Sequence, residues 1–201
     1  LPKSMTKNQS AMNRLASSDE LRASTEISSE SEPVSPLVAR SSSLPYVFFG
    51  TGPIAVRALE EMHAGGITPS LIVSSPDRPA GRGHMMTPSP VAQWATEHDI
   101  ETLKPEKLDH DFLTQLEARS SKLEARVFVV IDYGKFLPKR LLEIPERGVL
   151  NMHPSLLPRL RGPSPIRSAI LQDEKDTGIT VMLVDEEMDH GGIVAQKKID
   201  I

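Results

Sequence analysis

The sequence contains no cysteine. This absence excludes disulfide bonds, thiolate metal sites and cysteine nucleophiles, so any chemistry has to come from His, Asp, Glu, Asn, Ser or Lys. Apolar runs long enough to form a membrane-spanning helix are also missing, and the N-terminal residues lack the basic and then apolar pattern of a signal peptide. These absences predict a cytoplasmic protein that does not associate with a membrane.

An excess of basic residues is missing as well. The chain has 23 Lys and Arg against 27 Asp and Glu, which gives a formal net charge of −4. This balance argues against broad, sequence-independent binding of nucleic acids, although it leaves room for a local basic loop. With 201 residues, of which 38% are hydrophobic, the chain is long enough for one domain with a substantial core.

The first 45 residues differ in composition from the rest of the chain. Ser dominates, charges of both signs are scattered, and no apolar periodicity supports a packed helix or strand. We therefore expect residues 1–45 to be a disordered Ser-rich leader. A mitochondrial transit peptide is the functional alternative, but such peptides are poor in acids. This segment contains Asp19, Glu20, Glu26, Glu30 and Glu32.

From residue 46 to residue 201, short apolar runs alternate with amphipathic stretches. This pattern is typical of a parallel sheet with crossover helices. It predicts one doubly wound α/β domain whose mostly parallel sheet is flanked by helices. The expected helices are 54–63, 91–98 and 111–123, and the expected strands are 46–49, 70–74, 126–131, 148–153 and 179–184, with a last strand within 192–201.

A Gly-Thr-Gly-Pro-Ile-Ala run at residues 50–55 fits the G-x-G-x-x-A dinucleotide fingerprint between a strand and a helix. Pro53 can open a helix, so the two glycines can equally form only a tight turn. The acid that would bind a ribose is expected at the end of the second strand, but that strand runs into Ser-Ser-Pro at 74–76. The fingerprint is therefore weak evidence for a nucleotide site.

The expected strand 148–153 carries Asn151 and His153 two residues apart. Side chains at this spacing in a strand lie on the same face, and these two lie near the carboxyl edge, where α/β sheets bind ligands. An amide N–H and an imidazole N–H there can both donate to the oxyanion of an acyl transfer. They can equally hydrogen-bond loop carbonyls, and the residues alone leave both interpretations open.

An acidic segment, residues 185–192, follows the next expected strand. Its glycines at 191 and 192 permit a sharp turn that can bring Asp189 back to the sheet edge, where its carboxylate would pair with His153. A solvated acidic turn is the simpler alternative. The six histidines are dispersed and show no metal-ligand spacing, so we expect no metal site.

Two longer runs contain these residues, Asn-Met-His-Pro-Ser-Leu-Leu-Pro-Arg-Leu-Arg-Gly-Pro-Ser-Pro-Ile at 151–166 and Met-Asp-His-Gly-Gly at 188–192. In these runs the sequence resembles the folate-dependent formyltransferase family, and specifically its methionyl-tRNA formyltransferase branch. The resemblance begins at about Val47 and reaches the last residue. Asp-Arg-Pro-Ala-Gly-Arg-Gly at 77–83 separates the chain from the glycinamide ribonucleotide branch. The resemblance implies a Rossmann-like formyltransferase fold over residues 46–201.

The resemblance implies that a formyl group passes from 10-formyltetrahydrofolate, the donor substrate, to the α-amine of initiator methionyl-tRNA in translation initiation. It implies a monomer that needs no metal. By the same resemblance, Asn151 and His153 hold the oxyanion, and Asp189 orients His153 and favours its protonated form.

The resemblance also assigns binding residues. The folate-contacting set comprises a loop after the third predicted strand and the turn after His153, namely Tyr133, Gly134, Ser155, Leu156, Leu157 and Pro158. The tRNA-contacting set comprises three arginines, Arg78, Arg82 and Arg161.

The chain departs from the family pattern in several places. Asp132 stands where the family usually has a small residue, and a carboxylate beside an apolar folate pocket costs desolvation unless it faces solvent or finds a donor. His190 replaces the usual Thr, and residues 84–86 lack the usual Lys or Arg.

Family members continue beyond the position of Ile201 into more of the catalytic domain and a C-terminal tRNA-binding domain, so the catalytic domain is expected to be incomplete. This expectation leaves two alternatives. One is a truncated fragment that binds folate or tRNA without turnover, and the other is a formyltransferase that acts on an amino-sugar nucleotide.

Overall fold

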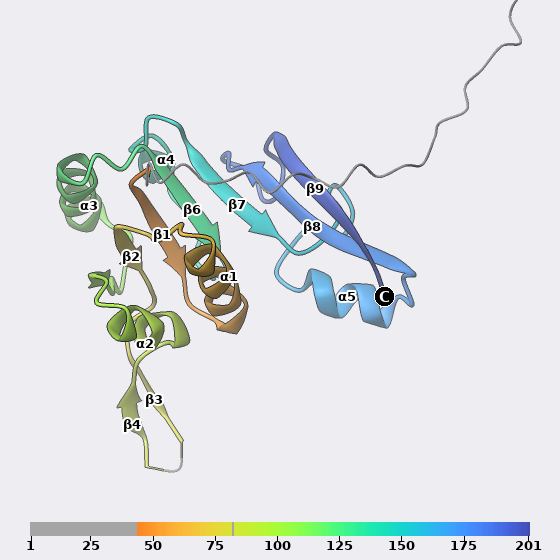
Figure 1. The fold of residues 1–201 in the computed structure, drawn as a ribbon, viewed down its shortest axis with the longest axis horizontal. Coiled ribbons are helices and arrows are strands. Elements are labelled where there is room, and N and C mark those ends of the chain that lie inside the picture. Colours follow the sequence, from red (N-terminus) through yellow and green to blue (C-terminus); the bar gives the residue numbers. More distant parts are fainter. Residues whose placement is uncertain (1–43, 82) are drawn as a thin grey trace, which may run out of the picture. The chain divides into compact units, whose positions relative to one another are not determined.

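Seven strands form the central sheet, in the order β5-β2-β1-β6-β7-β8-β9 (Figure 1). The computed structural model describes residues 44–81 and 83–201, so the predicted leader lies outside the described residues except for its last two positions. The strands of this sheet are β1 Tyr46–Gly50, β2 Leu71–Val73, β5 Thr102–Leu103, β6 Val127–Ile131, β7 Val149–His153, β8 Asp176–Leu183 and β9 Ile193–Asp200.

The first five strands of the sheet order run parallel, whereas β8 pairs antiparallel with β7 and β9 pairs antiparallel with β8. The chain leaves β1 in one direction toward β2 and β5 and returns to the other side of β1 with β6. Open α/β sheets bind ligands outside the carboxyl ends of the strands at such a reversal. The mostly parallel α/β fold expected from the sequence is confirmed.

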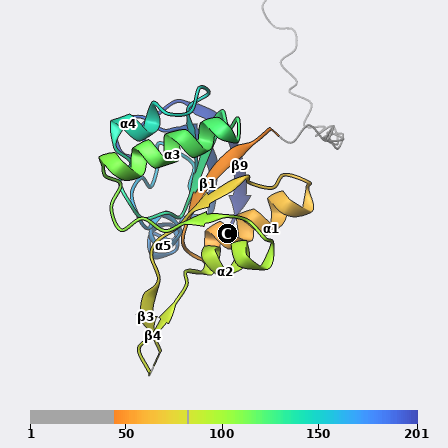
Figure 2. The ribbon, with the colours of Figure 1, turned by 90° about the vertical axis from the view of Figure 1, so that its left-hand side faces the viewer.

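Helices cover both faces of the sheet, and Figure 2 shows α1 and α2 on one side of the strands and α3 and α4 on the other. Side chains alternate between the two faces of the sheet along β1, which explains this arrangement. Val47 and Phe49 pack with buried residues of α3 and α4 in one hydrophobic cluster, the α3 and α4 cluster. Tyr46 and Phe48 pack with buried residues of α1 and α2 in a second one, the α1 and α2 cluster. The helices are α1 Pro53–Ala64, α2 Pro90–Glu97, α3 His110–Lys122, α4 Lys139–Leu142 and α5 Pro165–Leu171.

The local sequence accounts for the starts of α2 and α3. The Ser89 hydroxyl accepts a hydrogen bond from the N–H of Ala92 (3.1 Å), and Asp109 Oδ1 accepts one from the N–H of Phe112 (3.1 Å). Both are side-chain caps of the first helical turn. The three helices expected from apolar spacing are present, and their ends agree within one residue.

The segment 77–87 contains strands that the apolar pattern of the sequence does not predict. It contains a hairpin of β3 Arg78–Ala80 and β4 Met85–Thr87, which projects from the sheet (Figures 1 and 2). Neither strand contributes a buried residue, so no apolar alternation marks them in the sequence. The strand β5 and the helices α4 and α5 were not predicted either, because each is too short to show a periodic pattern of apolar residues.

Candidate active site

The strand β7 brings Asn151 and His153 to one face of the sheet. Val149 on the same strand packs in the α3 and α4 cluster, and Met152 packs against the α1 and α2 cluster on the opposite face. Asn151 and His153 therefore share the face of Val149. His153 is 5% exposed, and both residues line a cavity of about 760 Å³. This volume lies within the range of sites that bind small organic molecules.

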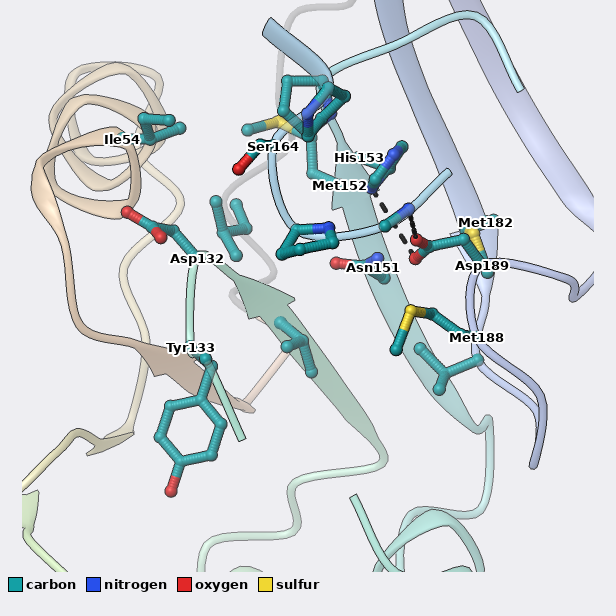
Figure 3. A pocket seen from close by; sticks show the side chains of 18 of the residues that line it. Ile54, Asp132, Tyr133, Asn151, Met152, His153, Ser164, Met182, Met188 and Asp189 are labelled. Carbon is teal, nitrogen blue, oxygen red and sulfur yellow. Dashed lines mark hydrogen bonds and ion pairs between the residues drawn. The ribbon is translucent and has the colours of Figure 1, made fainter. Parts of the chain in front are cut away.

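The imidazole of His153 has partners at both ring nitrogens, of which Figure 3 shows Asp189. Its Nε2 lies 3.1 Å from the carbonyl oxygen of Leu160, and its Nδ1 lies 3.6 Å from Asp189 Oδ1. A carbonyl oxygen can only accept, so Nε2 carries a proton and donates to Leu160. Protonation of Nδ1 then produces an imidazolium that faces the Asp189 carboxylate.

Asp189 is held from a second direction. Its Oδ2 accepts a hydrogen bond from the backbone N–H of Gly162 (2.8 Å), which belongs to the segment between β7 and α5. The side chains of His153 and Asp189 are only 7% and 12% exposed. The glycine turn inferred from the sequence is present, because a Cβ on Gly191 would collide with the carbonyl oxygen of Leu183.

The structure thus brings the three residues predicted to be catalytic to a single cavity. The Asn151 side chain has no hydrogen-bond partner among residues 44–81 and 83–201, so its amide can donate to a bound molecule. His153, in contrast, would have to exchange its bond to Leu160 in order to donate to an oxyanion. Their roles in catalysis stay predictions.

The residues predicted to contact folate separate into two groups. Tyr133 and Gly134 line the cavity, but the Tyr133 phenol points away from the Asn151 and Asp189 side chains (Figure 3). The ring lies in the core, with its edge against Phe49 at a centroid distance of 5.5 Å. Burial raises the pKa of the Tyr133 hydroxyl above its ordinary value. Tyr133 therefore stabilises the wall of the cavity from behind.

The turn at residues 155–158 does not line the cavity. The Ser155 hydroxyl is buried and donates to the Arg159 carbonyl (2.8 Å). Thr180 on β8 ties down the same turn, since its hydroxyl donates to the Ser155 carbonyl (2.7 Å) and accepts from the Leu157 N–H (3.1 Å). In the structure these residues serve to shape the segment that leads from His153 to Gly162, and their contact with folate stays a prediction.

The structure describes two of the three arginines predicted to contact tRNA. Arg78 lies on the exposed strand β3, 3.9 Å from Glu106, and Arg82 lies outside the described residues. Arg161 is exposed and close enough to His190 for its charge to act on that imidazole.

The Asp132 carboxylate faces the start of α1 (Figure 3), where the backbone N–H of Ile54 acts to lower its pKa. The N-cap residue of α1, Gly52, has no side chain to cap the helix, and a Cβ on Gly52 would collide with the Asp132 carboxylate. Asp132, directly after β6, therefore places its carboxylate at the start of α1 and also remains exposed to solvent. The carboxylate also occupies the helix N-terminus that a pyrophosphate would need, which argues against the dinucleotide interpretation.

We expect Asp132 to make the stability of the chain fall as the pH rises above the ordinary range of Asp. Burial raises the pKa of this carboxyl, and the Ile54 N–H lowers it less. The native state therefore binds more protons than the unfolded state between the ordinary and the raised pKa, so stability is lost across that interval. Asp132→Asn removes the titration and tolerates the backbone angle φ of 50°.

Urea unfolding between pH 4 and 7 tests this expectation. The difference in the free energy of unfolding, variant minus original chain, should increase with pH between the ordinary and the raised pKa of Asp132 and then level off. A constant difference would show that Asp132 has the same protonation behaviour in both states.

Sequence reasoning missed most of the apolar lining of the cavity. These side chains come from α1, α5, β8, the loop after β6 and the loop after β8, and they include Ile54, Phe136, Ile166, Ile170, Met182 and Met188. Ile166 and Met188 belong to the runs that carry the family resemblance, but nothing in the sequence shows that distant runs line one cavity.

Residues 44–81 and 83–201 contain no group of three or more His, Asp or Glu side chains able to hold a metal ion. Over the same residues, no helix is both long and apolar enough to cross a membrane.

Comparisons with known proteins agree with this geometry. Methionyl-tRNA formyltransferase from Chloroflexus aggregans is 45% identical over 156 residues, which cover 77% of this chain and 49% of the relative. The enzyme of the same name from Nitrosomonas europaea is 39% identical over 155 residues, which cover 77% of this chain and 47% of the relative. The chain thus spans about half the length of the curated relatives that it matches.

The solved structure of phosphoribosylglycinamide formyltransferase from Bacillus halodurans has the same fold. It aligns with a TM-score of 0.62 at 23% sequence identity, covering 78% of this chain and 80% of that chain. The family described as Formyl transferase matches residues 45–201, the whole α/β domain described above. The chain belongs to the formyl transferase family.

Proposed function

We propose that this chain transfers a formyl group from 10-formyltetrahydrofolate to the α-amine of initiator methionyl-tRNA. One observation carries the proposal, namely the buried pair of His153 and Asp189, 3.6 Å apart, beside Asn151 on the wall of a cavity of about 760 Å³. The curated relatives are named methionyl-tRNA formyltransferase, which supports the choice of acceptor.

The residues of the cavity suit each part of the reaction. The amine nitrogen attacks the formyl carbon, which converts the formyl oxygen into an oxyanion. The Asn151 amide, which has no partner among the described residues, donates to that oxygen. The protonated His153 provides the second donor after its Nε2–H leaves the Leu160 carbonyl, and catalytic hydrogen bonds often form only with substrate bound.

Asp189 supports the charge of His153 throughout. The bond to the donor nitrogen breaks as the oxyanion collapses, and that nitrogen leaves with a proton. The attacking amine loses a proton in the same reaction, so the imidazole and the carboxylate can relay one proton between the two nitrogens. No covalent intermediate with the chain is needed.

The apolar part of the cavity fits the ring system of a folate. Phe136 is 71% exposed and Met188 is 66% exposed although both line the cavity, so a bound ring would cover apolar surface that is otherwise in water. Gly134, with a positive φ of 74°, and Tyr133 form the backbone wall on this side.

For the acceptor, we assign Arg78 and Arg161, which are exposed, and Arg82, which is assigned from the sequence alone, to the phosphates of the tRNA. Arg78 lies on the projecting hairpin, so it is placed to reach a partner larger than the cavity.

A comparison of acceptors tests the proposal. With 10-formyltetrahydrofolate as donor, we expect formyl transfer to methionyl initiator tRNA and a kcat/KM at least about 100-fold lower for glycinamide ribonucleotide and for an amino-sugar nucleotide, since neither reaches the hairpin. Preference for the sugar nucleotide would overturn the assignment of the acceptor. Folate binding without transfer to any of the three would identify a non-catalytic binding domain.

A further inference from the structure

The loop that connects β8 and β9 carries Asp189, and its base is closed by the sheet. The N–H of Leu183 donates to the carbonyl of Gly192 (2.9 Å), and the N–H of Val184 donates to the carbonyl of Val149 on β7 (2.8 Å). Residues 185–191 therefore form a closed loop whose two ends are fixed next to β7, the strand that carries Asn151 and His153.

The carboxylate of Asp185 makes contacts across this loop. Asp185 Oδ2 lies 2.8 Å from His190 Nδ1, and Asp185 Oδ1 accepts the N–H of Glu187 (3.0 Å). Asp185, the first residue of the loop, is thus bonded both to Glu187 in the middle of the loop and to His190, the residue directly after Asp189.

The backbone of Asp189 needs such support. Its φ is 49°, in the left-handed region that costs energy for a residue with a side chain. In this conformation its carboxylate reaches Gly162 and His153, and the adjacent residue His190 is anchored by its side chain.

We infer that Asp185 and His190 are positioning residues, whose ion pair holds the Asp189 carboxylate against Gly162 and His153. The inference rests on the proposed function, because it deepens the account of the same site. Neither residue is required to contact a substrate.

The charges around this pair make the contact dependent on pH. The hydrogen bond from Asp185 raises the pKa of His190, with further support from the charge of Glu187, while Arg161 acts in the opposite direction. The bond to His190 lowers the pKa of Asp185. The pair is therefore complete between these two pKa values, and it is lost as the pH rises through the raised pKa of His190.

The pair is partly exposed, since the side chains of His190 and Asp185 are 52% and 41% exposed. Solvent screens an ion pair at such a position. We expect a moderate effect on turnover, which salt reduces.

Two substitutions at one position separate charge from hydrogen bonding. His190→Ala removes the contact, whereas His190→Asn places a neutral N–H donor at the position of Nδ1. We expect His190→Ala to lower kcat about two- to fivefold with the dissociation constant for folate unchanged. His190→Asn should stay within about twofold of the original chain at neutral pH.

The pH profile distinguishes a positioning role from a merely structural one. The ratio of kcat between the original chain and His190→Asn cancels the pH dependence that the two proteins share, and it should fall as the pH rises through the raised pKa of His190. Asp173→Asn is the matched control, because it removes a more exposed ion pair, with Lys175 at 2.9 Å, away from the loop. A flat ratio, or an equal change in Asp173→Asn, would overturn the inference.

Hydrogen exchange at the Gly162 amide provides a readout that needs no formyl transfer. The amide should exchange faster in His190→Ala than in the original chain, since the Asp189 carboxylate that accepts its hydrogen bond would no longer be held. Equal exchange would overturn the positioning role even if the chain transfers formyl groups normally. If the original chain transfers none, faster exchange in the variant still supports the contact while the proposed function fails.

Discussion

Asn151→Ala should lower kcat about 100- to 1000-fold, which corresponds to about 2.7–4 kcal/mol of transition-state stabilisation. The Asn151 amide has no partner among the described residues, so its donor is available for the oxyanion and costs no competing bond in the chain. The bond to the oxygen strengthens as negative charge develops. The dissociation constant for 10-formyltetrahydrofolate should therefore change less than about threefold.

Steady-state formylation of methionyl-tRNA, together with calorimetric binding of the folate, measures the two effects separately. Leu150→Met is a suitable control, because Leu150 neighbours Asn151 on β7 without lining the cavity and the substitution conserves volume. Loss of folate affinity with unchanged turnover in Asn151→Ala would assign this amide to binding instead of catalysis.

We expect Asp189→Asn to lower kcat by about 100-fold or more, the contribution typical of a positioned proton-transfer group. The substituted amide can still accept the N–H of Gly162 through its oxygen, so the loop should keep its conformation. It cannot support the positive charge of His153, whose Nδ1 lies 3.6 Å from the carboxylate in a site from which water is largely excluded. The variant thus isolates the charge of Asp189 from its structural contact.

Glu186→Gln serves as the control for loss of a negative charge in the same loop. Glu186 pairs with Lys139 at 2.6 Å, and both side chains are more than 60% exposed. This control should retain kcat within about twofold. Thermal unfolding of both variants should show a similar melting temperature. Equal kcat values for Asp189→Asn and Glu186→Gln would show that the buried carboxylate has no role in the reaction.

The prediction of the fold succeeded where the sequence repeats a local pattern. The continuous apolar runs in 46–50 and 127–131 report burial on both faces of a parallel sheet, and the spacing of apolar residues reports the helices α1, α2 and α3. The hairpin of β3 and β4 could not be found in this way. Its residues are held by backbone pairing to each other and not by burial, so their order carries no period.

The features of the candidate site that depend on local sequence patterns were predictable in the same way. A two-residue spacing within one strand is local information, so the sequence by itself determined that Asn151 and His153 lie on one face. The glycine pair after Asp189 likewise indicated a return of the chain toward the sheet. Motifs that span 151–166 and 188–192 were sufficient to indicate the family.

Only the tertiary structure decided which groups meet across the chain. It pairs Asp132 with the start of α1, closes the loop of Asp189 with the contact between Asp185 and His190, and directs His153 Nε2 to Leu160. It also places residues 155–158 outside the cavity that they were expected to line. These contacts depend on distances and directions between segments far apart in the sequence or within irregular loops. No local periodicity records such distances, because they are set by the packing of the helices and strands that separate the partners.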